Sequence, residues 1–260
     1  MSRAVCLFAA AFLALGFQAP RAARAQASAS TADAAPTPAC PPTIPMAATA
    51  EPLDAVAAAV RTGRVAMLAI GSATTVGQDG KANGVSFPYH MAEALRSALP
   101  RVSFDLTVKG SRGLTAREML PMLDAALAEQ PFALVLWQTG TVEAVHGAQI
   151  DGLHATLDAG VRHIRARGGD TVLIDPPFSR ALRANTDIEP YEQVMREVAG
   201  LPGVLLFQRY ELTRHWVESG LLDVEKAKPA DRLAAVDLQH ECVGRALAAF
   251  VLQNLHLPPP

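Results

Sequence analysis

Charged residues are scarce in this sequence, and the basic ones form no cluster. They make up 18% of the 260 residues, and 23 Lys and Arg against 25 Asp and Glu give a net charge of −2. Proteins that bind nucleic acid or an anionic membrane surface present a basic face, so the charge pattern disfavours both partners. Hydrophobic residues make up 50%, which is enough for a sizeable core and excludes wholesale disorder.

Motifs that bind phosphates, dinucleotides or metal ions are also missing. The sequence has no Gly-Lys-Ser/Thr phosphate loop and no glycine pattern of a dinucleotide site, and it lacks the G-x-S-x-G turn of lipase-type hydrolases. His146 and His154 lie eight residues apart, whereas zinc ligands on one helix are usually three or four apart. The sequence therefore predicts no cofactor and no metal ion.

An apolar run near the start of the chain predicts export. Residues 5–17 carry no charge, Arg3 precedes them, and an Ala-x-Ala cleavage signature ends at Ala25. This pattern is typical of a secretory signal peptide over residues 1–25; the alternative is a buried N-terminal helix. The run is short for a bilayer span, and no other run is long enough. We expect a periplasmic or secreted protein with no integral membrane segment after cleavage.

Cleavage would change both the charge and the cysteine count. Residues 1–25 contain three arginines and no acid, so their removal leaves 20 basic and 25 acidic residues and a net charge of −5. Cys6 is lost with them, and Cys40 and Cys242 remain. An even count in an oxidising compartment favours a disulfide; the alternative is two unrelated buried thiols.

The rest of the chain divides into a linker and one folded domain. Residues 26–50 are rich in Ala, Ser, Thr and Pro and predict a low-complexity linker, and residues 51–260 form the domain. There, apolar strands alternate with amphipathic helices, which predicts an α/β fold with a parallel sheet covered on both faces. The expected strands are 64–70, 102–108, 132–137, 171–174 and 204–207, and the expected helices are 87–99, 115–129, 150–167, 190–199, 211–218 and 239–254.

Ligands of parallel sheets bind at the carboxyl ends of the strands, so the residues there are candidates for chemistry. Ser72 follows the first strand directly, between Gly71 and a run of small residues, and a sharp turn there would expose its hydroxyl as a nucleophile. The alternative is a turn or helix-capping serine. Asp175 ends the fourth strand, where it shapes a substrate pocket or a structural turn. Glu143 is expected to be a solvated charge at the mouth of the site, and Trp137 a core residue.

The second chemical signal is Asp237-Leu238-Gln239-His240, at the expected start of the last helix. Three-residue spacing can bring the Asp237 carboxylate against the His240 ring, which would orient the imidazole as a base. The alternative is that Asp237 caps the helix and His240 is an exposed first-turn residue.

Taken in order, these motifs resemble the SGNH (GDSL-like) hydrolase family over residues 64–252. The resemblance implies a three-layer α/β/α, flavodoxin-like fold with a parallel sheet of about five strands, and cleavage of an ester or acyl group through an acyl-serine. It implies Ser72 as nucleophile and Asp237 and His240 as orienter and base. The oxyanion would be held by the N–H groups of Ser72 and Gly113, with Gly110 as the second candidate.

One position departs from the family pattern. The family has Gly-x-Asn-Asp after its third strand, and here Val142 stands where the Asn donates to the oxyanion. Losing one such donor typically lowers turnover by about 10²–10³; Gln138, Thr139 or Thr141 are candidate replacements. Three functions follow: an exported hydrolase of a small-molecule or polysaccharide acyl ester, an acyltransferase or deacetylase on an envelope polysaccharide, and a non-catalytic binding domain. A monomer is expected.

Overall fold

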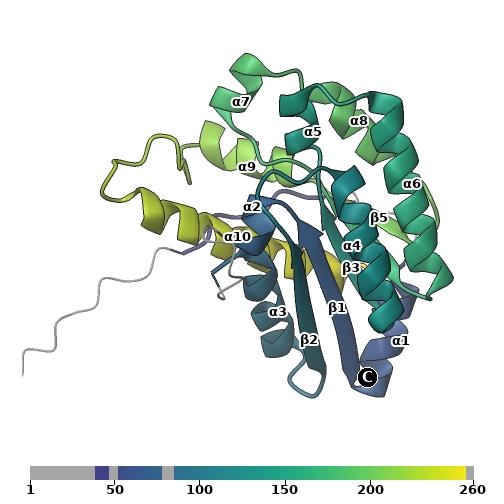
Figure 1. Ribbon diagram of the computed structural model, residues 1–260. Coiled ribbons are helices and arrows are strands. Elements are labelled where there is room, and N and C mark those ends of the chain that lie inside the picture. Colours follow the sequence, from purple (N-terminus) through teal and green to yellow (C-terminus); the bar gives the residue numbers. More distant parts are fainter. Residues whose placement is uncertain (1–38, 47–51, 78–84, 256–260) are drawn as a thin grey trace, which may run out of the picture. The chain divides into compact units, whose positions relative to one another are not determined.

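The computed structural model describes residues 39–46, 52–77 and 85–255. Five strands of this part pair in parallel in the order β2-β1-β3-β4-β5 (Figure 1). The strands are β1 (Arg64–Gly71), β2 (Ser103–Gly110), β3 (Leu134–Gln138), β4 (Asp170–Ile174) and β5 (Val204–Phe207). Every residue of β3 and β4 is buried, as expected where helices cover both faces.

The sheet separates two cores, and alternate residues of a central strand such as β1 contact one or the other. In β1, Met67 and Ala69 contact one core, and Leu68 and Ile70 contact the other. The first core lies under α1 (Asp54–Thr62), α3 (Phe87–Ala98), α9 (Arg209–Glu218) and α10 (Arg232–Gln253). The second lies under α4 (Ala116–Glu129), α6 (Ile150–Ala166) and α8 (Glu189–Val198). The predicted three-layer α/β/α fold is confirmed, and Trp137 is fully buried as expected.

The predicted terminal helix is wrong at its start. We expected residues 239–254, but α10 begins at Arg232, because Arg, Leu and Ala in the preceding segment favour helix and extend it. The short helices α2 (Ala73–Val76), α5 (Thr141–His146) and α7 (Arg180–Asn185) and the helix α1 were not predicted. Within the described ranges, no helix combines the length and the apolar character that a membrane crossing needs.

The two strands that carry the first candidate residues meet closely at their carboxyl ends. The register of β1 and β2 pairs Gly71 with Gly110, and a Cβ placed on Gly110 would lie 1.9 Å from the Gly71 carbonyl oxygen. Gly110 also has a φ of +135°, a backbone conformation that residues other than glycine rarely adopt. Glycine at this position therefore lets the loops after β1 and β2 come together.

A disulfide joins Cys40 to Cys242 on α10, with the two Cα atoms 5.2 Å apart. Near it, the Trp216 indole N–H donates to the Pro42 carbonyl at 3.0 Å, and Ile44 and Met46 pack against the first core. The segment 39–46, within the range expected to be linker, therefore lies against the folded domain. The predicted signal peptide and the rest of the linker range lie outside the described residues, and both remain predictions.

The disulfide is expected to contribute strongly to stability because it links residues 202 positions apart. We expect the double substitution Cys40→Ser and Cys242→Ser to lower the free energy of unfolding by about 2–5 kcal/mol, since long closed loops restrict the unfolded chain most. Urea unfolding measures the change. A reducing agent should lower the free energy of unfolding of the wild type but not that of the double variant. Equal free energies of unfolding without a reducing agent would contradict the expectation.

Candidate active site

Ser72 lies where the sequence predicted, directly after β1 and at the start of α2. Only 6% of the residue is exposed. Its hydroxyl oxygen accepts a hydrogen bond of 3.0 Å from the backbone N–H of Gly113, in the loop after β2. The structure thus brings together the predicted nucleophile and the predicted glycine donor.

The Gln138 side chain, at the end of β3, holds the turn that contains Ser72. Its Oε1 atom accepts from the Ser72 backbone N–H at 3.2 Å and from the hydroxyls of Thr74 at 3.2 Å and Thr75 at 3.1 Å. Because a backbone N–H can only donate, the amide oxygen rather than the nitrogen faces the turn. Gln138 therefore fixes the nucleophile turn, and the Ser72 N–H would have to be shared with this oxygen to serve an oxyanion.

The replacements considered for the missing asparagine are in different situations. Val142 lies in the first turn of α5. The Thr139 hydroxyl donates to Glu143 at 2.8 Å, so it is already engaged. The Thr141 hydroxyl is buried and has no hydrogen-bond partner among the described residues. Which group acts as the further donor stays a prediction.

Glu143 is not the solvated charge that the sequence suggested, because only 2% of it is exposed. Its carboxylate accepts from the Thr139 hydroxyl, from the Gly140 N–H at 2.9 Å and from the Ala116 N–H. The latter two donors belong to the starts of α5 and α4, where carboxylates are favourable. Glu143 thereby anchors the end of the loop that carries Gly113.

His240 lies on α10, half-buried, with its ring 6.5 Å from the Phe87 ring in an edge-on arrangement. Burial and the neighbouring Arg209 charge lower the pKa of His240 to about 4, while the Asp237 charge and a hydrogen bond with the Val85 main chain oppose this. The imidazole is therefore neutral at pH 7, the form that a general base requires.

Asp237 is three residues from His240 on the same helix, not before the helix as expected, and it is exposed. Residues at this spacing are neighbours on a helix surface, and the Asp237 charge raises the pKa of His240. In the described part of the chain, no hydrogen bond joins His240 to Asp237 or to Ser72. The proposed orienting role of Asp237 thus rests on charge and proximity, and the main chain of Val85 contacts the ring.

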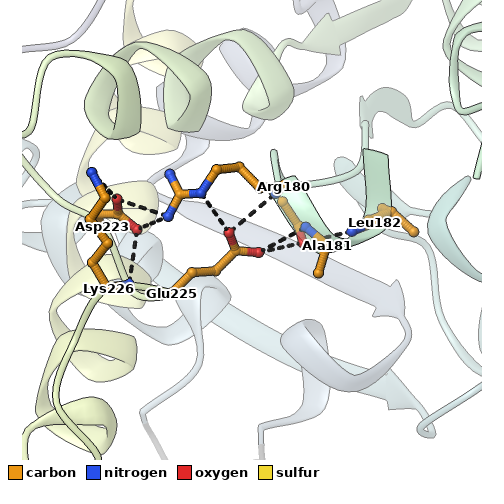
Figure 2. Close-up of polar contacts among 7 residues, drawn as sticks. Arg180, Ala181, Leu182, Asp223, Glu225 and Lys226 are labelled. Carbon is orange, nitrogen blue, oxygen red and sulfur yellow. Dashed lines mark hydrogen bonds and ion pairs between the residues drawn. The ribbon is translucent and has the colours of Figure 1, made fainter. Parts of the chain in front are cut away.

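A network of charges fixes the segment that leads into α10 (Figure 2). Arg180, at the start of α7, contacts both carboxylate oxygens of Asp223, at 2.8 and 3.0 Å, and forms an ion pair of 3.2 Å with Glu225. Glu225 also accepts from the Ser179 hydroxyl at 2.7 Å. The connection between α9 and α10 is therefore held against the loop after β4.

Sequence reasoning missed Arg209, the first residue of α9, although it follows β5 closely and the same strand-end rule would have found it. Only 2% of Arg209 is exposed. Its Nε donates to the Asp175 carbonyl at 3.0 Å, and its Nη1 donates to the Thr74 hydroxyl at 3.1 Å. The guanidinium also lies 5.7 Å from the centre of the Phe87 ring, within cation–π range.

Asp175 serves the start of α9. Its carboxylate accepts the backbone N–H of Tyr210 at 2.9 Å, which satisfies one of the free donors at a helix start. Burial raises the pKa of Asp175 to about 8. Asp175 thus has a structural contact at the start of α9, and Pro177, two residues further on, lines a small cavity together with His240. The choice between a substrate pocket and a structural turn stays a prediction.

Residues 39–257 match the non-GDSL lipase-like family, and the chain belongs to this family. Solved structures of similar fold include a catalytic mutant of Axe2, an acetylxylan esterase from Geobacillus stearothermophilus, at 16% identity and a TM-score of 0.55, covering 75% of this chain and 95% of that chain. LAE5, an alpha/beta hydrolase enzyme from the metagenome of Lake Arreo, Spain, matches at 19% identity and a TM-score of 0.57. The match covers 74% of this chain and 96% of LAE5. TesA matches at 20% identity and a TM-score of 0.55, and the match covers 71% of this chain and 98% of TesA. No curated protein matches this chain.

Removing the Glu143 charge should destabilise the fold at the site. We expect Glu143→Gln to lower the free energy of unfolding by about 2–4 kcal/mol, because hydrogen bonds to a buried charged acceptor are weakened and an amide N–H₂ replaces one accepting oxygen. Chemical unfolding measures it. Glu129→Gln, exposed at the end of α4, is the matched control and should change stability little.

The pKa of His240, at about 4, should appear in an NMR titration well below the value of about 6.5 for an unfolded histidine. The lowered pKa means that His240 favours folding above about pH 6.5 and that this contribution is lost as the pH falls towards 4.

Asp237→Asn should lower the His240 midpoint further, because the Asp237 charge raises it. The variant His240→Gln lacks the His240 imidazole resonance and therefore identifies that resonance in the spectrum. Asp124→Asn, on the opposite face of the sheet, should leave the midpoint unchanged. A His240 midpoint between pH 6 and 7 would contradict the assignment.

Proposed function

We propose that this protein hydrolyses an ester or acyl group through an acyl-serine formed on Ser72. The observation that carries the proposal is the position of the Ser72 hydroxyl at the carboxyl edge of a parallel sheet, with the Gly113 N–H directed at it from 3.0 Å. Such an N–H beside a nucleophile is what an oxyanion site needs. The proposed catalytic residues are Ser72, His240 and Asp237.

In the proposed reaction, His240 removes the Ser72 proton and the serine oxygen attacks the acyl carbonyl. The Gly113 N–H, with the Ser72 N–H, holds the negative oxygen of the intermediate. His240 then gives its proton to the leaving alkoxide, and water releases the acyl group by the reverse sequence. Catalytic hydrogen bonds often tighten only when substrate is bound, and His240 is expected to meet Ser72 at that stage.

The similar structures support an ester substrate. The acetylxylan esterase has catalytic mutants at a serine, an aspartate and a histidine, and the last two are three positions apart, as Asp237 and His240 are. We propose an acyl ester of a small molecule or a polysaccharide as the substrate. Disulfides persist in oxidising compartments, so the bond between Cys40 and Cys242 supports a periplasmic or secreted protein. From the sequence we further propose cleavage after residue 25 and a monomer.

A fluorophosphonate probe, which reacts with activated serines, tests the proposal. We expect the folded wild-type protein to be labelled and Ser72→Ala to lose all labelling, because the probe forms its bond with the nucleophile. Ser97→Ala, an exposed serine of α3, should be labelled like the wild type. Absence of labelling in folded wild-type protein would favour the non-catalytic alternative.

A second measurement separates hydrolysis from acyl transfer. Hydrolysis predicts that acetate is released from an acetylated polysaccharide in buffer alone, and that His240→Ala lowers this rate by at least about 10³ through loss of the base. Transfer predicts that the acetyl group leaves the polysaccharide only when an acceptor alcohol is added, and that it is then recovered as an ester of that alcohol.

A further inference from the structure

A small cavity beside His240 contains a buried positive charge that the proposed reaction does not use. The cavity has a volume of about 30 Å³, and its walls include Arg209, His240, Thr74, Phe87 and Pro177. Thr74 is two residues from Ser72, so the cavity adjoins the proposed site. About 10–15 Å³ is enough for one water molecule, and the cavity therefore has room for a group with about two oxygen atoms.

Arg209 lines this cavity and has one guanidinium donor that is not used. Two of its three guanidinium nitrogens are engaged, Nε with the Asp175 carbonyl and Nη1 with the Thr74 hydroxyl. Nη2 is buried and has no hydrogen-bond partner among the described residues. A buried donor without a partner is unfavourable, and a guanidinium is suited to carboxylate oxygens.

The charge of Arg209 is only partly compensated, by the nearby Asp175. No carboxylate of the described chain forms an ion pair with it, and Asp175, which is near, contributes its carbonyl rather than its carboxylate. Burial raises the pKa of Asp175 and lowers that of Arg209, and the charge of each residue opposes the shift of the other. A buried charge without a direct ion-pair partner is unfavourable, which favours binding of an anion beside Arg209.

The position of His240 indicates which part of a substrate would enter the cavity. In the proposed reaction His240 gives its proton to the leaving alkoxide, so the space next to its ring lies on the alcohol side of the ester. The acyl group, held between Ser72 and Gly113, lies on the other side of the scissile bond.

We infer that Arg209 binds a carboxylate on the alcohol portion of the substrate, an inference that rests on the proposed function. The enzyme then prefers esters of hydroxy acids, sugar acids among them. The chemistry is unchanged: the ester C–O bond breaks, the acyl group stays on Ser72 until water takes it, and the hydroxy acid leaves with the proton from His240. Arg209 selects the leaving group.

Two acetate esters of equal shape test this inference: O-acetylglycolate, which carries the carboxylate, and O-acetylglycolamide, which does not. We expect wild-type kcat/KM to favour the carboxylate ester. Arg209→Gln should lower the ratio of the two kcat/KM values by about tenfold or more, the scale of a hydrogen bond to a charged group. Arg209→Lys, which keeps the charge, should retain part of the preference. Arg214→Gln, on the same helix and paired with Glu211, should leave the ratio unchanged.

A purely structural role of Arg209 would lower both kcat/KM values equally, and an unchanged ratio in Arg209→Gln overturns the inference. Binding of glycolate and glycolamide to Ser72→Ala, followed by NMR, separates this inference from the proposed function. The carboxylate subsite is supported, even if no ester is cleaved, when Ser72→Ala binds glycolate more tightly than glycolamide and the double variant Ser72→Ala, Arg209→Gln does not. Equal binding of the two ligands overturns the subsite while leaving ester hydrolysis standing.

Discussion

Parallel hydrogen bonding between the strands aligns their carboxyl ends along one edge of the sheet, and the candidate groups depend on this alignment. Ser72 follows β1, Gly113 follows β2, Gln138 ends β3, Asp175 follows β4 and Arg209 follows β5. The close pairing of Gly71 with Gly110 then brings the first two loops together. Distant parts of the sequence thus meet because of register, and a slip of one residue in any strand would separate them.

Two buried acidic residues near the same edge hold the starts of helices. Glu143 and Asp175 are both buried, and each accepts backbone N–H groups at helix starts, Glu143 at α4 and α5 and Asp175 at α9. The helix starts compensate these carboxyl groups, and the carboxyl groups hold the helices. Arg209 differs from these two acids because its Nη2 has no hydrogen-bond partner among the described residues, which is why we propose it as a binding group.

Much of this arrangement could be predicted from the sequence. The apolar strands and amphipathic helices have clear periodicity, which predicted the fold. The strand-end rule then pointed to Ser72, and the family resemblance pointed to Gly113. The burial of Glu143 could not be predicted, because it depends on donors contributed by α4, which is distant in sequence. The start of α10 was misplaced because Asp237 resembles a cap, although the helix-favouring residues before it continue the helix. Gln138 was considered only as an oxyanion donor, since the turn that it holds is formed by tertiary contact.

The disulfide has a consequence for how the molecule would withstand proteolysis. Together with the backbone, the bond between Cys40 and Cys242 makes a covalent ring that contains every strand of the sheet. A single proteolytic cut anywhere between these two cysteines would leave the pieces joined as one molecule. Ser72 and His240 lie within the ring, so a nicked chain could keep both halves of its candidate site in the same particle.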